Sequence, residues 1–189
     1  MSYLSETDVR GRAARAALDL HMSVRGALGA RPPADSDAFD VFLSHSSSEP
    51  EEILLGVKAI LEESGLKVYV DKYGDPQLSP DNVTPETAEV LRRRMRQSAS
   101  LLYVYSQYSK ASRWMPWELG FFDGFKGAVG IIPVTRNQEE TFKGEEYLNL
   151  YPYVDIAKLR DTQESRLWIN KVPGTFTLLD RWVRGTAHL

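Results

Sequence analysis

The fold is decided by one short stretch, which reads Phe39-Asp40-Val41-Phe42-Leu43-Ser44-His45-Ser46-Ser47. Its first five residues are apolar except for Asp40, and such a run is typical of a strand that is buried on both faces of a sheet. Polar residues follow at once, so the strand ends in hydroxyl groups. In an open parallel sheet, ligands bind beyond this end of a strand.

The sequence around this stretch alternates short apolar runs with helical segments. Strands are predicted at 39–43, 66–70, 100–105, 129–134 and 151–155. Helices are predicted at about 49–64, at 85–98, from 112 onward, from Thr162 past Trp168, and near 176–183. Gly65 suits a helix C-cap, and Pro85 suits a first helical position. The pattern predicts an α/β, flavodoxin-like fold, with a five-stranded parallel sheet flanked by helices.

Residues 1–28 precede this pattern and predict a helix. Apolar side chains recur there at three- and four-residue spacing, which gives one apolar face: Val9, Ala13, Ala16, Ala17, Leu20 and Val24. Gly29 ends the segment, and residues 31–37 predict a linker. We therefore expect an N-terminal helical extension with its linker at 1–37 and an α/β domain with C-terminal helices at 38–189. The extension is expected to pack on the core or on a second copy.

The composition excludes several classes of protein. The chain has 189 residues and a net charge of -3, so no overall basic field points to nucleic acid. It contains no cysteine and only three histidines, which lie far apart, so neither disulfides nor a metal site is expected. No apolar run approaches the roughly 20 residues that span a membrane, and no apolar signal core is present. A cytoplasmic protein is the default expectation.

A second run of chemical interest is Ser112-Arg113-Trp114-Met115-Pro116-Trp117-Glu118-Leu119-Gly120. Trp114 and Glu118 are four residues apart, so they lie on one side of the expected helix. A carboxylate beside an indole ring suits a nucleotide sugar. Taken alone, the run favours an exposed helical glutamate next to core tryptophans, and Trp117 is open between packing and binding.

Together, the two runs resemble the signatures of the TIR (Toll/interleukin-1 receptor) domain family. The resemblance extends over roughly residues 38–155, and it is to standalone bacterial TIR proteins of the NAD-cleaving, Thoeris-like defence kind. It implies that Glu118 is catalytic and that Trp114 holds a ring by stacking. It also implies that NAD⁺ is the substrate and that no other cofactor is needed.

The resemblance places further residues near the substrate. Ser44 and Ser46 are implied to hold phosphates, with His45 near the ligand. Capping of the following helix by Ser47 or Ser48, with Glu51 as partner, is the alternative for the serines. A purely structural role is the alternative for His45.

The run Gly65-Leu66-Lys67-Val68-Tyr69-Val70-Asp71 resembles the second strand of the family. Asp71 could bind a ribose or order the following loop, and Tyr69 could bind substrate or only pack in the sheet. In the family the loop at Lys72 to Thr84 joins neighbouring domains, which implies self-association. Arginines at 92, 93, 94 and 96 predict a solvated face, or a contact with the acidic residues Glu49, Glu51 and Glu52 of a neighbouring copy.

The function implied is that of an NAD⁺ glycohydrolase or ADP-ribosyl cyclase. Nicotinamide leaves as a neutral molecule, so no general acid is required, and one carboxylate can stabilise the oxocarbenium-like transition state. The product is ADP-ribose or a cyclic isomer that signals to an effector in anti-phage defence. A non-enzymatic TIR interaction module and a nucleoside deoxyribosyltransferase stay open as alternatives. A response-regulator receiver is set aside, because Ser44-His45-Ser46 stand where its acidic pair is needed.

Overall fold

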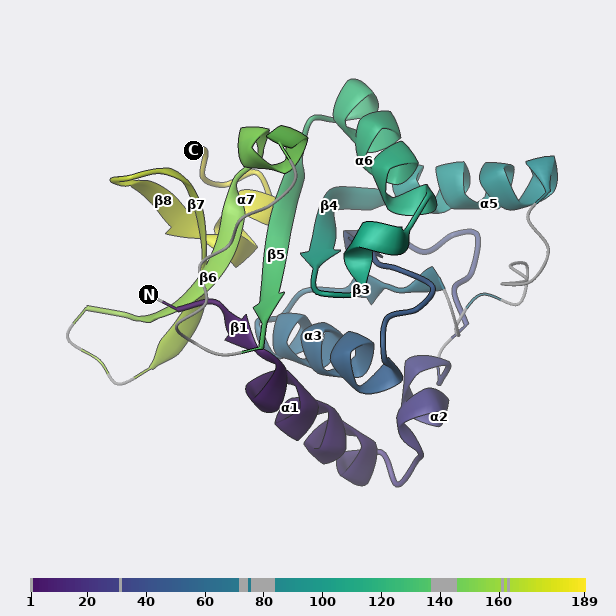
Figure 1. The fold of residues 1–189 in the computed structure, drawn as a ribbon, viewed down its shortest axis with the longest axis horizontal. Coiled ribbons are helices and arrows are strands. Elements are labelled where there is room, and N and C mark those ends of the chain that lie inside the picture. The colour runs from purple at the N-terminus through teal and green to yellow at the C-terminus, as the bar shows by residue number, and fades with distance from the viewer. Residues whose placement is uncertain are drawn as a thin grey trace.

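A computed structural model describes residues 2–30, 32–71, 75, 84–136, 146–160, 162 and 164–189. A twisted sheet runs through the molecule between two layers of helices (Figure 1). Five parallel strands form its centre in the order β3-β2-β4-β5-β6. These strands are β2 (Phe39–Ser44), β3 (Val68–Tyr69), β4 (Ser98–Tyr105), β5 (Val129–Thr135) and β6 (Tyr153–Lys158). The predicted α/β class and its five parallel strands are confirmed.

Alternate residues of β2 face opposite helix layers. Val41 and Leu43 join a core with α3 (Glu51–Glu63), whereas Phe42 joins a second core with α5 (Pro85–Arg96) and α6 (Trp114–Phe125). Because both faces of the strand are covered, its apolar run lacks the alternation of a half-exposed strand. Two 3₁₀ helices, η1 (Ser109–Ala111) and η2 (Glu146–Leu150), complete this part of the chain.

The helix ends follow the local sequence signals, with one exception. Gly65 has a φ of 78° directly after α3, and Thr84 forms a capping box with Thr87 ahead of Pro85. The N-cap of α3, however, is Pro50, which makes no side-chain hydrogen bond. Capping of this helix by Ser47 or Ser48 is therefore wrong.

The C-terminal part of the chain differs from the prediction. Where a helix was expected past Trp168, β7 (Ser165–Val172) runs antiparallel to β6, and β8 (Thr175–Leu178) pairs with β7. Leu167 and Ile169 are buried on alternate positions, which is the period of a strand, and Gly174 turns the hairpin with a φ of 84°. The predicted last helix is confirmed only in part, as α7 (Leu179–Val183).

The N-terminal extension is also more divided than predicted. Residues Leu4–Ser5 form β1, which pairs with β5, and the helical part is split into α1 (Glu6–Asp19) and α2 (Val24–Leu28). His21 separates the two helices with a φ of 54°, a left-handed conformation that ends a helix. The boundary between extension and domain at 37/38 stays a prediction.

The helix α1 packs on α3 of its own core. Its buried face is made of Val9, Ala13 and Ala17. The two helices cross at Gly56, where an added Cβ would lie 2.0 Å from the Val9 carbonyl oxygen. Only glycine therefore allows this crossing, and the predicted packing of the extension on the core is confirmed.

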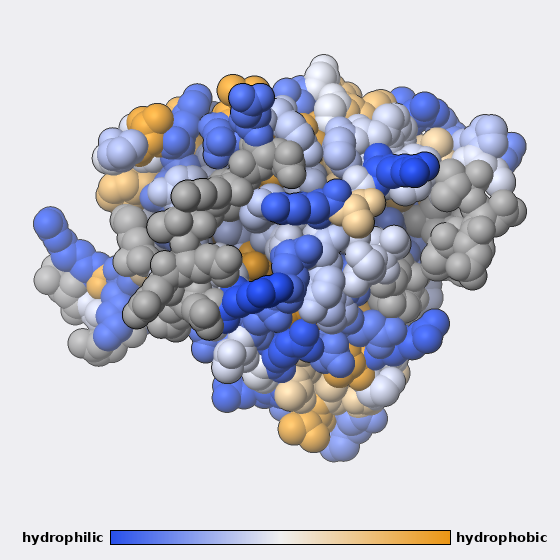
Figure 2. Space-filling view, in the orientation of Figure 1, coloured by the Kyte–Doolittle hydropathy of each residue, from blue (hydrophilic) through white to orange (hydrophobic). Residues whose placement is uncertain are grey.

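The surface is mainly polar on the face seen in Figure 2. An apolar patch lies at the lower end of that view, where the corner between α1 and α2 projects, and Leu18, Leu20 and Met22 are exposed at this corner. In the described part of the chain, no helix combines the length and the apolar character that crossing a membrane would require.

Candidate active site

The candidate site lies at the edge of the sheet where β2 and β4 end and α6 begins. Ser44 is the last residue of β2 and is paired in register with Tyr103 of β4. Glu118 lies in the second turn of α6 and is only 2% exposed. The Ser44 hydroxyl donates a hydrogen bond to the Glu118 carboxylate, with 2.5 Å between Oγ and Oε2. Two segments that the sequence singled out are thus brought together.

A histidine and a second carboxylate belong to the same cluster. The His45 Nδ1 atom lies 3.0 Å from the Ser46 carbonyl oxygen, and Nε2 lies 2.7 Å from the Asp71 Oδ1 atom. A carbonyl and a carboxylate oxygen only accept hydrogen bonds, so this arrangement favours a proton on each ring nitrogen. The contact with Asp71 is an ion pair without hydrogen-bond alignment, since neither of its two atoms has a hydrogen-bond partner.

The electrostatics of the cluster favour a charged histidine and oppose a second negative charge. Burial lowers the pKa of His45, but the Asp71 carboxylate, the Ser46 carbonyl and the charge of Glu118 together raise it, and the net pKa is above the ordinary value. Burial raises the pKa of Glu118 to about 8, and the negative charge of Asp71 adds to this rise. The Ser44 hydrogen bond and the charge of His45 oppose it. A cationic ligand beside Glu118 would favour its carboxylate form.

The two tryptophans of α6 differ in their surroundings. The half-buried Trp114 meets Trp117 edge to face, with 5.2 Å between ring centroids. Trp117 also stacks on Phe121 at 6.0 Å, and the Arg92 guanidinium lies 5.5 Å from its ring. Trp117 therefore belongs to a row of aromatic side chains between α5 and α6, which gives it a packing role.

Tyr69 takes part in a buried polar group. Its hydroxyl donates to Asp75 Oδ2 at 3.2 Å, and Arg94 Nε donates to the same oxygen at 2.7 Å. Desolvation, followed by the charges of Asp71 and Asp75, raises the pKa of Tyr69. The assignment of Tyr69 to substrate binding stays a prediction, with its hydroxyl already engaged.

Arg94 corrects the prediction of a solvated arginine face. Its side chain is 0% exposed, as is that of Asp75, while Arg92, Arg93 and Arg96 are between 38% and 51% exposed. The signal was present in the sequence, because Arg94 follows Val90 and Leu91 by four and three residues and so shares their buried face of α5.

The loop after β2 is built differently from the prediction. Ser46 is 1% exposed, and its Oγ lies 2.8 Å from that of Ser48. Glu49 is 2% exposed and accepts a hydrogen bond from the Ser106 hydroxyl at 2.8 Å. Its assignment to an acidic contact surface is therefore wrong, and its buried pairing with Ser106 left no pattern in the sequence.

A small cavity lies near the candidate site, although none of the candidate site residues lines it. This cavity of about 210 Å³ opens beside the first turn of α6 and is lined mainly by aromatic and polar side chains, among them Tyr103, Tyr105 and Ser112, with Pro116. The described residues hold no group of three or more side chains suited to a metal ion.

The segment from Lys72 to Thr84 lies outside the described residues apart from Asp75 and Thr84, so self-association through it stays a prediction.

Comparisons with known proteins agree with this architecture. The profile of the TIR domain family matches residues 41–168. The Bacillus cereus (strain MSX-D12) protein named "Probable 3' cyclic ADP-D-ribose synthase ThsB'" is 40% identical over 147 residues, which cover 77% of this chain and 76% of that protein. TIR2 of Cytobacillus dafuensis, provisionally named a cyclic ADP-D-ribose synthase, is 32% identical over 84 residues, or 44% of this chain and 22% of that protein.

One solved structure aligns more distantly. The TIR domain of the Toll-related Receptor TRR-2 from Hydra magnipapillata has a TM-score of 0.43 and 19% identity, over 61% of this chain and 82% of that chain. The family assignment rests instead on the profile match over more than half of the chain and on the Bacillus cereus relative. On this ground, the chain belongs to the TIR domain family.

Proposed function

We propose that this chain is an enzyme that cleaves NAD⁺ between nicotinamide and ribose and forms a cyclic ADP-ribose. The observation that carries the proposal is the buried Glu118 carboxyl group, held at the sheet edge by the Ser44 hydroxyl at 2.5 Å. The Bacillus cereus relative, named a 3' cyclic ADP-D-ribose synthase, supports the same chemistry.

The chemistry needs one well-placed negative charge. As the bond to nicotinamide breaks, the bonding electrons leave with the neutral ring, and positive charge develops on the ribose. A carboxylate in a water-poor site stabilises such a charge far more strongly than it would in bulk water. Glu118 is 2% exposed, so it meets this condition. The cationic nicotinamide ring would lower the raised pKa of Glu118 and so bring the carboxylate to its active form.

The other residues of the cluster bind and orient the substrate in this proposal. His45, charged through its ion pair with Asp71, lies at the strand end where a diphosphate would sit. Ser46 assists there, Asp71 accepts hydrogen bonds from ribose hydroxyls, and Trp114 stacks on a ring. Tyr69 supports the site by packing, because its hydroxyl is taken by Asp75.

Burial of the cluster favours cyclisation over hydrolysis. In cyclisation, a hydroxyl oxygen of the same nucleotide forms the new bond to the ribose carbon that loses nicotinamide, and its proton is released to solvent. In hydrolysis, water takes the place of that hydroxyl. Ser44 and Ser46 are each 1% exposed and Glu118 is 2% exposed, so water has little access to the reacting carbon and an internal hydroxyl has the advantage.

The test is product analysis in H₂¹⁸O. Purified wild type, Glu118→Gln and the control Glu62→Gln are incubated with NAD⁺, and the products are analysed by chromatography and mass spectrometry. Glu62 is a surface residue of α3 paired with Lys58. Wild type and Glu62→Gln should release nicotinamide and an unlabelled cyclic product, and Glu118→Gln should release neither. ADP-ribose labelled with ¹⁸O would show that the enzyme hydrolyses NAD⁺ instead of cyclising it. No nicotinamide from concentrated wild type would instead favour the non-enzymatic interaction module.

Three further parts of the proposal concern the setting of the reaction. We infer that copies associate through the segment from Lys72 to Thr84, that the product signals to an effector, and that this occurs in the bacterial cytoplasm during anti-phage defence. Association predicts that activity per enzyme molecule rises with protein concentration. A rate strictly proportional to enzyme concentration would contradict it.

A further inference from the structure

A buried arginine on α5 joins the linker of the N-terminal extension to the segment that follows β3. The side chains of Arg94 and of its ion-pair partner Asp75 are both 0% exposed. The Nε atom of Arg94 donates to Asp75 Oδ2 at 2.7 Å. Nη1 and Nη2 donate to the carbonyl oxygens of Ala34 and Pro33 at 3.1 and 3.3 Å, and Nη1 also donates to Gln97 Oε1 at 3.1 Å. All three nitrogens of the guanidinium are therefore engaged.

Such a buried pair is better suited to fixing positions than to adding stability. Removing two charges from water costs several kcal/mol per ion, so apolar residues of the same size often stabilise a core as well or better. A guanidinium, in contrast, holds several acceptors at once because its N–H groups form a rigid plane. Here the acceptors belong to the linker, to α5 and to Asp75. Arg94 thus sets the position of two connecting segments relative to one helix.

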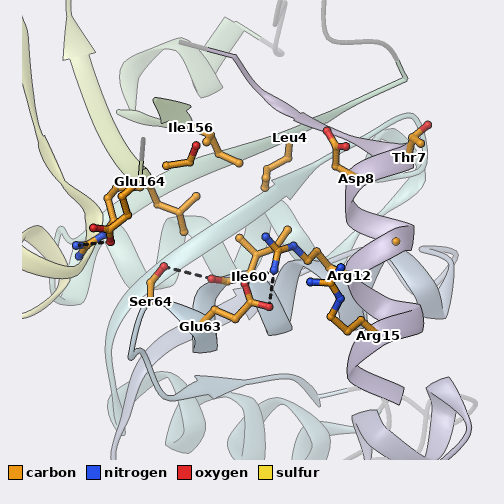
Figure 3. Close-up of a pocket in the computed structure, with 14 residues that line it drawn as sticks. Leu4, Thr7, Asp8, Arg12, Arg15, Ile60, Glu63, Ser64, Ile156 and Glu164 are labelled. Atoms are coloured by element: carbon orange, nitrogen blue, oxygen red, sulfur yellow. Dashed lines mark hydrogen bonds and ion pairs between the residues drawn. The ribbon is translucent and has the colours of Figure 1, made fainter. Parts of the chain in front are cut away.

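The extension is attached to the core in two places, which lie in different helix layers. Its helix α1 packs on α3, where Arg12 binds Glu63 with N–O distances of 2.9 and 2.7 Å (Figure 3). Its linker is bound by Arg94 of α5, which belongs to the layer on the other side of the sheet. The second attachment is the one that includes Asp75.

Asp75 is connected in turn to the end of β3 through Tyr69. The Tyr69 hydroxyl donates at 3.2 Å to the same carboxylate oxygen as Arg94 does. In the described sheet β3 is an edge strand, and its pairing with β2 holds it at two positions only. Asp71 lies two residues beyond these paired positions. The place of Asp71 therefore depends on the side chains that anchor this end of β3.

Asp71 is the residue that this series of contacts brings to the active site. Its Oδ1 atom lies 2.7 Å from His45 Nε2, and the His45 side chain is 3% exposed. Among the described residues, the charges that face His45 come from Asp71 and from Glu118 of α6. Attraction between charges in a buried site falls with distance and with the entry of water. A displacement of Asp71 would therefore change the charge state of His45.

We propose that Arg94 is a positioning residue of the active site. By fixing Asp75 it steadies the end of β3, and so it holds Asp71 against His45. The linker is the second anchor of the same guanidinium, so it forms part of the support of the site. The proposal rests on the proposed function for what the site does, whereas the contacts that carry it involve no substrate.

The first test is the pKa of His45, measured by an NMR pH titration in which its signal is identified by its absence in His45→Gln. Arg94→Met should lower this pKa by roughly one unit or more, because Asp71 no longer keeps its place. Loss of the positive charge alone would raise the pKa, so the sign separates the two effects. Arg93→Met removes an equal charge from a side chain that is 38% exposed, and it should not lower the pKa. An unchanged or raised pKa in folded Arg94→Met would overturn the proposal.

Two further variants decide the question if Arg94→Met does not fold. Adding Asp75→Asn to Arg94→Met removes the unpaired buried charge, so stability should recover while the anchor is still absent. Tyr69→Phe removes the hydroxyl that binds Asp75 and keeps the ring in its core packing. Both variants should lower the pKa of His45. An unchanged value in the double variant would overturn the role of Arg94, and an unchanged value in Tyr69→Phe would overturn the connection through Tyr69.

Turnover of NAD⁺ is the second readout, and with it the proposed function and the positioning role can fail separately. Arg94→Met should raise the KM for NAD⁺ several-fold and lower kcat less, because His45 and Asp71 bind substrate in the proposal. Arg12→Ala removes an ion pair of the other attachment and should leave both values unchanged. Inactive wild type would contradict the proposed function and leave the titration result intact. A loss confined to kcat, or an equal effect of Arg12→Ala, would contradict the positioning role.

Discussion

Ser44 and Glu118, 74 positions apart in the chain, are joined by a hydrogen bond of 2.5 Å between the serine hydroxyl and the carboxylate. One residue ends the central strand β2 and the other lies in the second turn of α6. The bond stabilises the ionised form of a carboxyl group whose burial otherwise favours the neutral form. Ser44 is thus placed to control the charge on which the proposed reaction depends.

Replacing Ser44 should therefore move the pH dependence of the reaction. In Ser44→Ala the pKa of Glu118 should rise further, because the donor that lowers it is lost. The acid limb of the pH–rate profile should shift upward by roughly one unit, the size expected for a hydrogen bond to a charged group. The matched control is Ser100→Ala, which removes a hydroxyl that donates to the Asp40 carbonyl oxygen instead. If the acid limb of the pH–rate profile is unchanged in Ser44→Ala, Ser44 does not control the pKa of Glu118.

The free and substrate-bound enzyme should titrate differently. The pH dependence of kcat/KM reports the free enzyme, so its limb should lie near the raised Glu118 pKa of about 8. The limb of kcat reports the complex, where the cationic nicotinamide ring favours the carboxylate, so it should lie at lower pH. Steady-state rates between pH 5 and 9 measure both limbs. Coinciding limbs would mean that the substrate cation does not approach Glu118.

The same carboxyl group should make the fold sensitive to alkaline pH. The folded pKa of Glu118, about 8, is above its ordinary value of 4.5, so the folded state binds the proton more tightly than the unfolded chain. The resulting stability is complete below about pH 4.5 and is lost as the pH rises through 8. The raised pKa of His45 acts in the same direction.

Glu118→Gln tests this linkage, because the amide mimics the neutral carboxyl group and can still accept from Ser44. We expect the variant to gain up to roughly 4–5 kcal/mol of stability at pH 8, since the pKa rises from 4.5 to about 8, which is about 3.5 units, and one unit corresponds to about 1.4 kcal/mol. The gain should vanish near pH 5, while activity is lost at both values. Urea unfolding at the two pH values measures it. An equal gain in stability at both pH values would mean that the gain comes from packing and not from the ionisation of Glu118.

The sequence predicted the central site because its residues sit where regular elements begin and end. Ser44 follows a strand that is apolar on both faces, and Glu118 shares a helical run with Trp114, so the sheet edge that joins them could be inferred from the parallel order of the strands. Nothing in either run specified the bond between them. That bond depends on how far α6 turns toward β2, which tertiary packing decides.

Two other parts of the structure, β7 and the environment of Arg94, have sequence patterns that fit two structural interpretations. The segment at β7 carries the apolar run Leu167-Trp168-Ile169, which was predicted as part of a helix that breaks at Pro173-Gly174, whereas the structure buries Leu167 and Ile169 on one face of a strand. The run of arginines at 92, 93, 94 and 96 predicts a solvated face that includes Arg94. The position of Arg94 relative to Val90 on α5 was the better guide, because a helix buries positions rather than residue types.

The crossing of α1 over α3 should fail if Gly56 gains a side chain. In Gly56→Ala the Cβ would lie 2.0 Å from the Val9 carbonyl oxygen, so one of the two helices has to move. We expect a loss of at least about 1–3 kcal/mol, the range for overpacked cores. The control is Gly120→Ala on α6, where a Cβ meets nothing within 4 Å. That variant should be more stable by about 0.5–1 kcal/mol. Equal melting temperatures would contradict the close crossing.

Among the ion pairs described here, the pair of Arg94 and Asp75 should cost the protein most stability when one partner is removed. Both side chains are 0% exposed, and Arg94 also donates to the carbonyl oxygens of Pro33 and Ala34. Arg94→Ala leaves the Asp75 charge buried without its partner, so we expect a loss of about 3–5 kcal/mol in denaturant unfolding.

Two further variants separate the buried charge from lost packing. Arg92→Ala removes a surface partner of Glu89 and should cost less than about 1 kcal/mol. Adding Asp75→Asn to Arg94→Met should recover part of the loss seen in Arg94→Met alone, because a neutral amide replaces the unpaired carboxylate and can still accept from Tyr69. If the double variant is no more stable than Arg94→Met, the loss arises from the contacts of Arg94 with residues 33–35 rather than from the charge of Asp75.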